Sequence, residues 1–349
     1  MNYHLAHLKI GRRIISPNHK PLVIPEIGIN HGGSLQVAFK IVDAAKRAGA
    51  EIIKHQTHIP ADEMSNEAKF IKPGNSNKNI YEIISNACLN EEEEFKLFNY
   101  VKKKKMIYLS TPFSRAAVDR LVKFGVSAFK IGSGEMNNFP LLDYVCKFRK
   151  PLIISTGMQS ILGVKKTVKF LSKKTNKFSL MHTTNLYPTP NNLVRLNSIT
   201  ELKKAFPNKI IGLSDHTESN ISSLGAIALG ACIIEKHFVD TKKRKGPDIS
   251  SSIDEKELKQ LIKDCKTIFV QKNGSKTYLK QEQVTRNFAF ASVVSISEIH
   301  KGDKLTKKNI WVKRPGTGDF KAINFRNLLG KKANKKIKKN FQIKKNDIK

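Results

Sequence analysis

The stretch KIIGLSDHTESNISSLGAIALGACIIEKHF, residues 209–238, contains one full unit of the fold. It opens with an apolar run that ends in Asp215 and His216, continues as a helix-like segment that closes on glycine, and finishes with a second apolar run that ends in His237. Apolar runs without polar alternation are typical of parallel strands that are covered on both faces. The stretch therefore predicts two neighbouring parallel strands joined by a helix.

The same unit recurs on both sides of this stretch, from residue 21 to about 269. The apolar runs are LVIPEIG (22–28), AEIIKHQ (50–56), MIYLSTP (106–112), AFKIGSGE (128–135), PLIISTG (151–157), FSLMHTTN (178–185), KIIGLSDH (209–216) and ACIIEKHF (231–238). Eight strands that alternate with helices over about 250 residues are the pattern of an α/β protein of the (β/α)8 TIM-barrel class. An open doubly wound sheet is the competing arrangement, and counting strands does not exclude it.

Two of the intervening segments carry helix signals at both ends. SLQVAFKIVDAAKRAG (34–49) has apolar residues at i, i+3, i+4 and i+7 and ends in glycine, and SRAAVDRLVKFG (114–125) begins at a serine and also ends in glycine. Serine is a favoured N-cap and glycine is favoured just after the last helical residue. We expect amphipathic helices at both places.

The domain boundaries are placed where the residue pattern of the sequence changes. Residues 1–271 form the predicted barrel domain, residues 272–287 form a polar linker, and residues 288–349 form a small β-rich domain. Two sets of apolar residues in this tail have the same spacing, which indicates a weak internal repeat. The matched sets are Ile299, Leu305 and Ile310, and Ile337, Ile343 and Ile348.

The composition excludes several classes of protein. With 40% hydrophobic residues the chain can bury a large core, and it has no run of about 18 apolar residues that would predict a membrane span. The start, MNYHLAHLKIGRRIIS, lacks the apolar region of a signal peptide, so we expect a cytoplasmic protein. The four cysteines are scattered and form no C-x-x-C pair, so we expect free thiols.

The net charge of +34 raises the question of nucleic-acid binding, because a strongly basic chain is the usual footprint of such proteins. The excess is nearly all lysine and is spread along the whole chain, and the aromatic residues lie mostly inside apolar runs, away from basic patches. We interpret the charge as compositional bias and expect no nucleic-acid partner. A positive field would still attract an anionic substrate.

Polar residues gather where the apolar runs end. In a parallel barrel these carboxyl ends lie on one face, where the active sites of this fold are found. The residues at the ends of the runs are Glu26, Lys54, Gln56, Ser110, Thr111, Lys130, Ser133, Glu135, Ser155, Thr156, Thr184, Asn185, Ser214, Asp215, His216, Glu235, Lys236 and His237. Their presence in all eight runs indicates an active site.

His216 and His237 hold matched positions at the ends of adjacent strands. Neutral imidazoles so placed can share a Mn²⁺-class metal and leave coordination positions open for water or a substrate oxygen. A structural zinc site normally has more protein ligands, and the sequence does not clearly supply a third. A structural role for each histidine is the alternative.

Lys54 and Lys130 lie inside apolar runs. A lysine on a barrel strand is either a Schiff-base nucleophile or a fixed positive charge for phosphate or carboxylate. Two such lysines, with serines near the same strand ends, favour a small dianionic ligand. The remaining alternative is that both lysines point outward between strands and helices.

Ten segments, taken in order, resemble those of the N-acetylneuraminate (sialic acid) synthase family over nearly the whole chain. They are PEIGINHGGS, IIKHQTH, STPFSRAA, FKIGSGEMNNFPLL, ISTGMQS, TTNLYPTP, GLSDHT, EKHF, KGPDIS and FAFASVV…NIWVKRPGTG. The sequence departs from the family at Gly32, because it reads NHGG where the family more often has NHNG.

The resemblance implies a (β/α)8 barrel followed by an antifreeze-like (SAF) domain, in a domain-swapped homodimer whose tails cover the partner's barrel mouth. It also implies an enzyme that condenses phosphoenolpyruvate with N-acetylmannosamine and water to give N-acetylneuraminate and phosphate, with cleavage of the C–O bond. The implied cofactor is a divalent metal, Mn²⁺ in the first place and Mg²⁺ or Co²⁺ as alternatives.

Residue roles carry over from the same resemblance. Phosphoenolpyruvate would be surrounded by Lys54, Lys130, Thr111, Ser133, Ser155, Asn185 and Ser214. The sugar would contact Gln56, Glu135, Tyr187 and Asp248, and the partner subunit's Arg314 would reach its N-acetyl group. The metal would be held by His216 and His237. Glu26 would lie near the reacting carbons as an acid, a base or a positioning group, and with Lys54, Lys130 and Glu135 it makes up the expected catalytic set.

Three other functions compete with this interpretation. A related synthase of legionaminic or pseudaminic acid would use a diacetamido-trideoxyhexose as the aldehyde. A Schiff-base aldolase would use Lys54 or Lys130 covalently, and a basic binding protein would use the lysine excess on nucleic acid. Trapping with borohydride and pyruvate, or a steep salt dependence of DNA binding, would favour the last two.

Overall fold

The computed structural model describes residues 6–74 and 76–349 and divides the chain into two compact units, Met1–Asn273 and Gly274–Lys349. The predicted cytoplasmic start therefore lies partly, at residues 1–5, outside the described residues. No helix among the described residues is long and apolar enough to cross a bilayer.

The first unit is a closed barrel of eight parallel strands, so the barrel prediction is confirmed and the open sheet is excluded. Each strand lies between its sequence neighbours, and the last strand closes on the first. The strands are β3 (Leu22–Gly28), β4 (Ile52–Thr57), β5 (Ile107–Pro112), β6 (Phe129–Ile131), β7 (Leu152–Ser155), β8 (Phe178–Thr183), β9 (Ile210–Asp215) and β10 (Ile233–His237).

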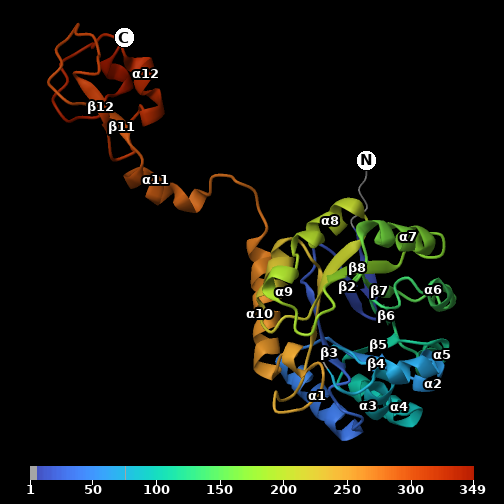
Figure 1. Cartoon of the computed structure of the whole chain (residues 1–349). Coiled ribbons are helices and arrows are strands. Elements are labelled where there is room, and N and C mark those ends of the chain that lie inside the picture. Colours follow the sequence, from blue (N-terminus) through green and yellow to red (C-terminus); the bar gives the residue numbers. More distant parts are fainter. Residues whose placement is uncertain (1–5, 75) are drawn as a thin grey trace. The chain divides into compact units, whose positions relative to one another are not determined.

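Helices surround the strands in chain order, as the colours of Figure 1 show. They are α1 (Leu35–Ala48), α4 (Glu91–Lys103), α5 (Arg115–Phe124), α6 (Phe139–Cys146), α7 (Ile161–Ser172), α8 (Asn197–Ala205), α9 (Ile221–Ala228) and α10 (Glu255–Gln271). The predicted caps are confirmed. Ser34 and Ser114 accept hydrogen bonds from backbone N–H groups in the first turns of α1 and α5, and Gly49 and Gly125 end these helices with φ of 96° and 80°.

The amino end of the barrel is filled by a hairpin that the sequence did not predict. Strands β1 (Leu8–Ile10) and β2 (Arg13–Ile15) pair in antiparallel register before the first barrel strand. Their buried side chains join one apolar cluster with inward-facing residues near the strand starts, among them Leu22, Ile52 and Ile210. Burying each such side chain stabilises the fold by about 1.5–3 kcal/mol. The lower half of the barrel interior is therefore packed with apolar side chains.

A long excursion separates β4 from α4. It contains α2 (Pro60–Glu63), the 3-10 helix η1 (Asn66–Phe70) and α3 (Ile80–Ala87). Helix α3 packs against Ile29 in the loop that follows β3, so the excursion covers the carboxyl end of the barrel. Gly32 in this loop has φ of 55°, a left-handed conformation that asparagine also adopts, so the departure from NHNG needs no change of backbone.

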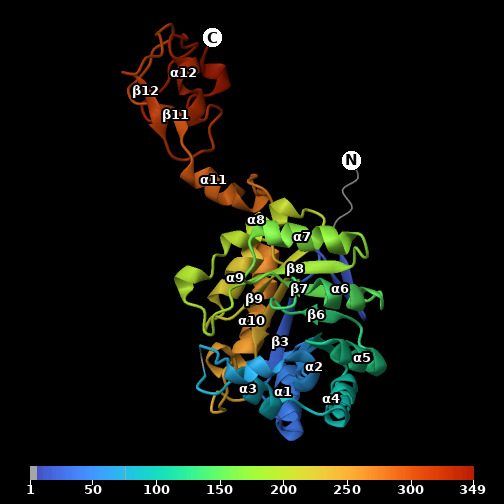
Figure 2. The same ribbon diagram turned by 45° about the vertical axis from the view of Figure 1, so that its right-hand side comes forward.

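The C-terminal unit contains a short antiparallel pair, β11 (Ser292–Ser295) and β12 (Ile310–Lys313), and helix α12 (Phe325–Leu328), which Figure 2 labels. Its buried core includes residues of both repeat copies, and Ile299 pairs with Ile337 across the two halves. Helix α11 (Gln283–Ala289) begins within the segment expected to be a linker. The remaining single turns are η2 (Asn191–Leu193), η3 (Ile249–Ser251), η4 (Lys280–Glu282), η5 (Ala322–Asn324) and η6 (Lys345–Asp347).

Candidate active site

The upper half of the barrel interior is polar. Because side chains alternate along a strand, each of the eight strands contributes one inward polar residue above the apolar cluster. These residues, each no more than 4% exposed, are Glu26, Lys54, Thr111, Lys130, Ser155, Thr183, Ser214 and Glu235. The two lysines point inward, so the interpretation of outward-pointing lysines is wrong.

Two lysines and two carboxylates form the centre of this polar interior. Lys54 Nζ lies 2.7 Å from Glu26 Oε1 and 3.3 Å from Glu235 Oε1. Lys130 Nζ lies 3.5 Å from the same Glu235 oxygen and donates a hydrogen bond of 2.6 Å to Ser155 Oγ. Ser214 Oγ donates to Glu235 Oε1 at 3.0 Å. Both lysine ammonium groups therefore contact the same carboxylate, that of Glu235.

The surroundings of the two lysines shift their pKa values in opposite directions. Burial lowers the pKa of Lys54, but Glu235 and Glu26 outweigh it and raise that pKa above its ordinary value. Lys130 has no carboxylate of its own, so burial dominates, the charge of Lys54 adds to it, and the pKa of Lys130 falls to about 8. Burial raises the pKa of Glu26, yet Lys54 and His237 together hold it well below its usual range.

His216 and His237 come together at the ends of β9 and β10, with ring centroids 5.5 Å apart. His216 Nδ1 lies 2.9 Å from the carbonyl oxygen of Thr184, so Nδ1–H donates there and Nε2 keeps its lone pair. Burial and the neighbouring His237 lower the pKa of His216 to about 3, which leaves the ring neutral. Tyr187 stacks on His216 at 4.2 Å between centroids.

His237 connects the histidine pair to the lysine pair. Its Nε2 lies 3.6 Å from Glu26 Oε2, and its Nδ1 lies 3.7 Å from Asp248 Oδ2. Nδ1 is buried and has no hydrogen-bond partner among the described residues. Burial and Glu26 raise the pKa of Asp248 despite the nearby His237.

A cavity of about 790 Å³ opens above this centre. Six of the residues singled out in the sequence line it, namely Gln56, Glu135, Asn185, Tyr187, His237 and Asp248. Burial raises the pKa of Glu135. Arg314 lies in the C-terminal unit, where it is exposed. The structure therefore gathers the predicted barrel residues around one interior, whereas Arg314 belongs to the C-terminal unit.

Several buried polar atoms near this interior have no hydrogen-bond partner among the described residues. They are Thr111 Oγ1, Thr183 Oγ1, Asn185 Oδ1, Glu235 Oε2 and His237 Nδ1. Buried polar atoms are normally paired, so such a cluster is typical of a place where a ligand supplies the partners. Gly157 makes room here, because a Cβ at this position would lie 1.8 Å from Asn185 Oδ1 and 2.7 Å from Ser133 Oγ.

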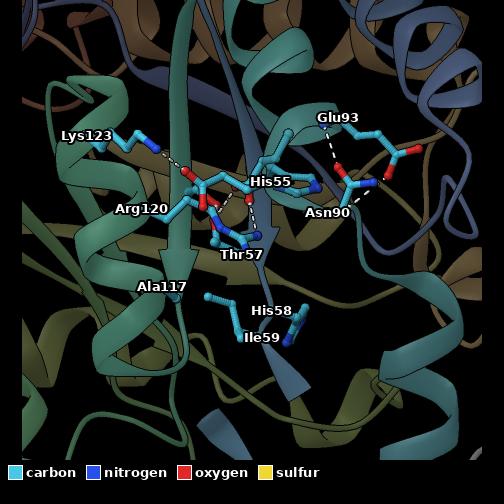
Figure 3. A network of polar contacts seen from close by, with 12 residues as sticks. His55, Thr57, His58, Ile59, Asn90, Glu93, Ala117, Arg120 and Lys123 are labelled. Atoms are coloured by element: carbon cyan, nitrogen blue, oxygen red, sulfur yellow. Dashed lines mark hydrogen bonds and ion pairs between the residues drawn. The ribbon is translucent and has the colours of Figure 1, made fainter. Parts of the chain in front are cut away.

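A buried carboxylate holds the outer face of β4. Glu94 on α4 accepts hydrogen bonds from Thr57 and Tyr108 on Oε1 and from Arg120 on Oε2. Figure 3 labels Thr57, Arg120 and His55 of this network. Tyr108 in turn lies 2.9 Å from His55 Nδ1. His55 and Thr57 flank Gln56, whose side chain points into the cavity. The network therefore fixes the strand end that presents Gln56.

Three residues of this interior were given no role from the sequence. Thr183 and Glu235 lie two residues before Asn185 and His237, so the alternation of a strand could have placed them on the same inner face. Glu235 was noted at its strand end but was given no role. His58 follows Gln56 by two residues and lines the cavity, and the same alternation pointed to it.

Family models match both units of the chain. The model of the NeuB family matches residues 41–277, and the model of the SAF domain matches residues 290–349. An N,N'-diacetyllegionaminic acid synthase of Campylobacter jejuni is 36% identical over 93% of this chain and 99% of its own length. A pseudaminic acid synthase of the same species is 33% identical over 98% of this chain and all of its own length.

A solved structure supports the same assignment. The N-acetylneuraminic acid (sialic acid) synthetase of Leptospira borgpetersenii, solved in complex with citrate, has a TM-score of 0.73 and 29% identity over 81% of this chain and 96% of its own. The antifreeze-like domain expected at the C-terminus is confirmed by the SAF match. The chain is therefore an enzyme of the NeuB family, whose named members include synthases of sialic, legionaminic and pseudaminic acids.

Proposed function

We propose that the barrel condenses phosphoenolpyruvate with the open-chain aldehyde of N-acetylmannosamine and water, and releases N-acetylneuraminate and phosphate. The observation that carries this proposal is that Glu26 joins the two halves of the site. One of its oxygens pairs with Lys54 and the other faces His237. An anion held by the lysines and an aldehyde held at the histidines would meet beside this carboxylate.

The polar interior suits a small anion with two charged groups. Lys54 and Lys130 supply positive charge in a buried setting, where electrostatic stabilisation is strongest. Thr111 and Asn185 supply buried polar atoms that lack partners among the described residues. Ser133 Oγ accepts a hydrogen bond from the backbone N–H of Gly157 at 3.1 Å, so its own hydroxyl proton is free for a ligand oxygen.

The residues present also fit a divalent metal. His216 is neutral and carries its lone pair on Nε2, which lies 3.4 Å from Ser214 Oγ, and His237 has a buried Nδ1 without a hydrogen-bond partner among the described residues. No group of three or more histidine, cysteine or acidic side chains in the described part of the chain is arranged to hold a metal. We propose that these two imidazoles hold the ion, which would be Mn²⁺, Mg²⁺ or Co²⁺. Bound there, it would act as a Lewis acid on the aldehyde oxygen.

The side chains of the barrel would carry the remaining steps. Gln56, Tyr187 and Asp248 line the cavity and would orient the sugar hydroxyl groups. The enol carbon of phosphoenolpyruvate would attack the aldehyde carbon, and water would add to the carbon that bears the phosphate. Collapse of this centre would break the C–O bond, so the bridging oxygen would leave with phosphate. Lys54 and Lys130 would stabilise the anionic groups throughout.

A second aldehyde is a candidate because the relative at 36% identity is a legionaminic acid synthase. Its substrate class, a diacetamido-trideoxyhexose, would require the same handling of phosphoenolpyruvate and a different fit in the outer cavity. Cytoplasmic location and the domain-swapped homodimer, in which the partner subunit's Arg314 would reach the sugar, remain predictions of the same proposal.

A phosphate-release assay tests the proposal. The enzyme is incubated with phosphoenolpyruvate labelled with ¹⁸O at the bridging position, and with either N-acetylmannosamine or a diacetamido-trideoxyhexose. We expect phosphate release with N-acetylmannosamine, recovery of the label in phosphate, and loss of activity with EDTA that Mn²⁺ restores. Activity with the diacetamido sugar alone would support the second candidate. Borohydride trapping of a pyruvate adduct on Lys54 or Lys130, with activity that survives EDTA, would refute both.

The low pKa of Lys130 predicts how the use of phosphoenolpyruvate depends on pH. Lys130 is charged below its pKa of about 8 and loses its proton above it. We therefore expect kcat/KM for phosphoenolpyruvate to fall as the pH rises through about 8, since this ratio follows groups of the free enzyme. A Lys130→Arg variant keeps its charge at all these pH values and should lose the fall, at a lower overall rate. A fall of the same size in Lys130→Arg would assign the titration to another group.

A further inference from the structure

His58 is a cavity residue that the proposed reaction does not use. It follows the end of β4, is 5% exposed and stacks on Phe113 with ring centroids 4.2 Å apart and an interplanar angle of 11°. Its Nδ1 lies 2.9 and 3.1 Å from the two carboxylate oxygens of Glu63 on α2. Its Nε2 lies 3.2 Å from Gln56 Oε1. Both ring nitrogens are therefore occupied by protein groups.

The hydrogen-bond roles at His58 follow from its neighbours. Gln56 Nε2 donates to Glu26 Oε1 at 2.7 Å, so the other end of that amide, the carbonyl oxygen Oε1, faces His58. A carbonyl oxygen and a carboxylate only accept hydrogen bonds. His58 must then donate from both ring nitrogens, which makes it an imidazolium. With both protons engaged, the ring has no lone pair with which to take a proton from a substrate.

We infer that His58 is a positioning residue, which acts on Glu26 through the orientation of the Gln56 amide. Glu63 holds the imidazolium, the imidazolium fixes which end of the amide faces Glu26, and the amide N–H then donates to Glu26 Oε1. This inference rests on the proposed function, because it assigns Glu26 to the reacting centre.

The orientation matters because Glu26 Oε1 has two donors, Lys54 and Gln56, each at 2.7 Å. If the amide turned over, its carbonyl oxygen would face the carboxylate and repel it. Glu26 would then move, and with it the oxygen that faces His237. Small displacements of a positioned group lower turnover by up to about 100-fold.

A double-mutant cycle tests the inference. His58→Phe keeps a ring against Phe113 but removes both donors, and Gln56→Ala removes the group through which His58 acts. We expect His58→Phe to lower kcat by about tenfold with little change in KM for phosphoenolpyruvate. In the Gln56→Ala background the same change should have no further effect on kcat. Effects that multiply in the double variant, or a His58→Phe enzyme with the kcat of the wild type, would overturn the inference.

Two further variants separate positioning from loss of structure. Glu63→Gln removes the charge that holds the imidazolium and should lower kcat, whereas Glu67→Gln changes an exposed carboxylate of the same excursion and should not. His58→Gln, whose amide can still donate to Gln56, should recover part of the kcat lost in His58→Phe. Thermal unfolding of each variant shows whether it is folded. Equal kcat in Glu63→Gln and Glu67→Gln would contradict the role of Glu63.

A measurement on the resting enzyme decides the matter independently of turnover. Nitrogen-15 spectra of the histidine rings, with the His58 signals assigned by their absence in His58→Phe, should show two protonated nitrogens in the wild type and one in Glu63→Gln. A neutral His58 in the wild type would refute the inference. If the wild type turned over no sugar, the proposed function would fail, while this spectrum would still test the His58 hydrogen bonds.

Discussion

Replacing Glu94 with alanine is expected to lower the free energy of unfolding by about 3–5 kcal/mol, the usual cost of removing one partner of a buried ion pair. The Glu94 side chain is 1% exposed and its partner Arg120 only 11%. Alanine would leave that guanidinium without its carboxylate, and the hydroxyl groups of Thr57 and Tyr108 without their acceptor. Urea unfolding, followed by circular dichroism, measures the change.

A matched control lies two residues away on the same helix. Glu92 pairs with Lys96 in a salt bridge whose side chains are 78% and 57% exposed. Exposed pairs of this kind contribute little because water screens them. Glu92→Ala should therefore unfold at the urea concentration of the wild type. If Glu92→Ala and Glu94→Ala had the same midpoint, the network around Glu94 would not stabilise the barrel.

These two glutamates also show which contacts the sequence alone does not determine. The run EEEE at 91–94 begins α4, and the helical spacing of Glu94 with Leu97, Phe98 and Val101 places Glu94 on the buried face, but this spacing does not identify the groups that pair with its carboxylate. Its partners are supplied by β4 and β5, where Thr57 lies 37 residues before Glu94 in the chain and Tyr108 lies 14 residues after it. The β1–β2 hairpin could not be predicted for the same reason, because its few apolar residues are buried only by contact with the amino end of the folded barrel.

The strands and most inner residues were predictable for a physical reason. A strand of a (β/α)8 barrel is covered on both faces, so its sequence is an unbroken apolar run, and a polar residue near its end stands out. His216, His237, Lys54 and Lys130 were found in this way. The pattern could not give the electrostatics of the site, because the pKa of Lys130 is lowered first by its burial and then by the positive charge of Lys54, which contacts the same Glu235 carboxylate.

The sequence also did not predict that the excursion between β4 and α4 contributes to the site. Its sequence reads as a loop with short helical pieces, yet it supplies Glu63 and the isoleucines of α3 to the cavity wall. A loop contributes to a site through its three-dimensional path, and that path depends on contacts such as the one between α3 and Ile29. The resemblance to a family pointed to strand-end residues, and it gave no role to this wall.

Lys54→Met is expected to lower kcat/KM for phosphoenolpyruvate by about 10³-fold, or about 4 kcal/mol of transition-state stabilisation. Lys54 is the only described cation within 3 Å of Glu26, and it also lies 3.3 Å from Glu235. Without it, two buried carboxylates would face an incoming anion with only Lys130 to offset them. The pKa of Glu26, which Lys54 helps to hold down, would rise, and the carboxylate would be protonated more easily.

The matched control for this variant is Lys236→Met. Lys236 has no exposed side-chain surface and pairs with Asp215 at 3.2 Å, so it is as buried as Lys54, but it points to the outer face of the barrel. Both variants should unfold more easily than the wild type, because each leaves a buried carboxylate unpaired. Steady-state kinetics at saturating sugar should separate them, since only Lys54→Met should raise KM for phosphoenolpyruvate. If both variants lost activity in proportion to their loss of stability, the activity would not depend on the inward position of the Lys54 ammonium group. That result would contradict the proposed anion site.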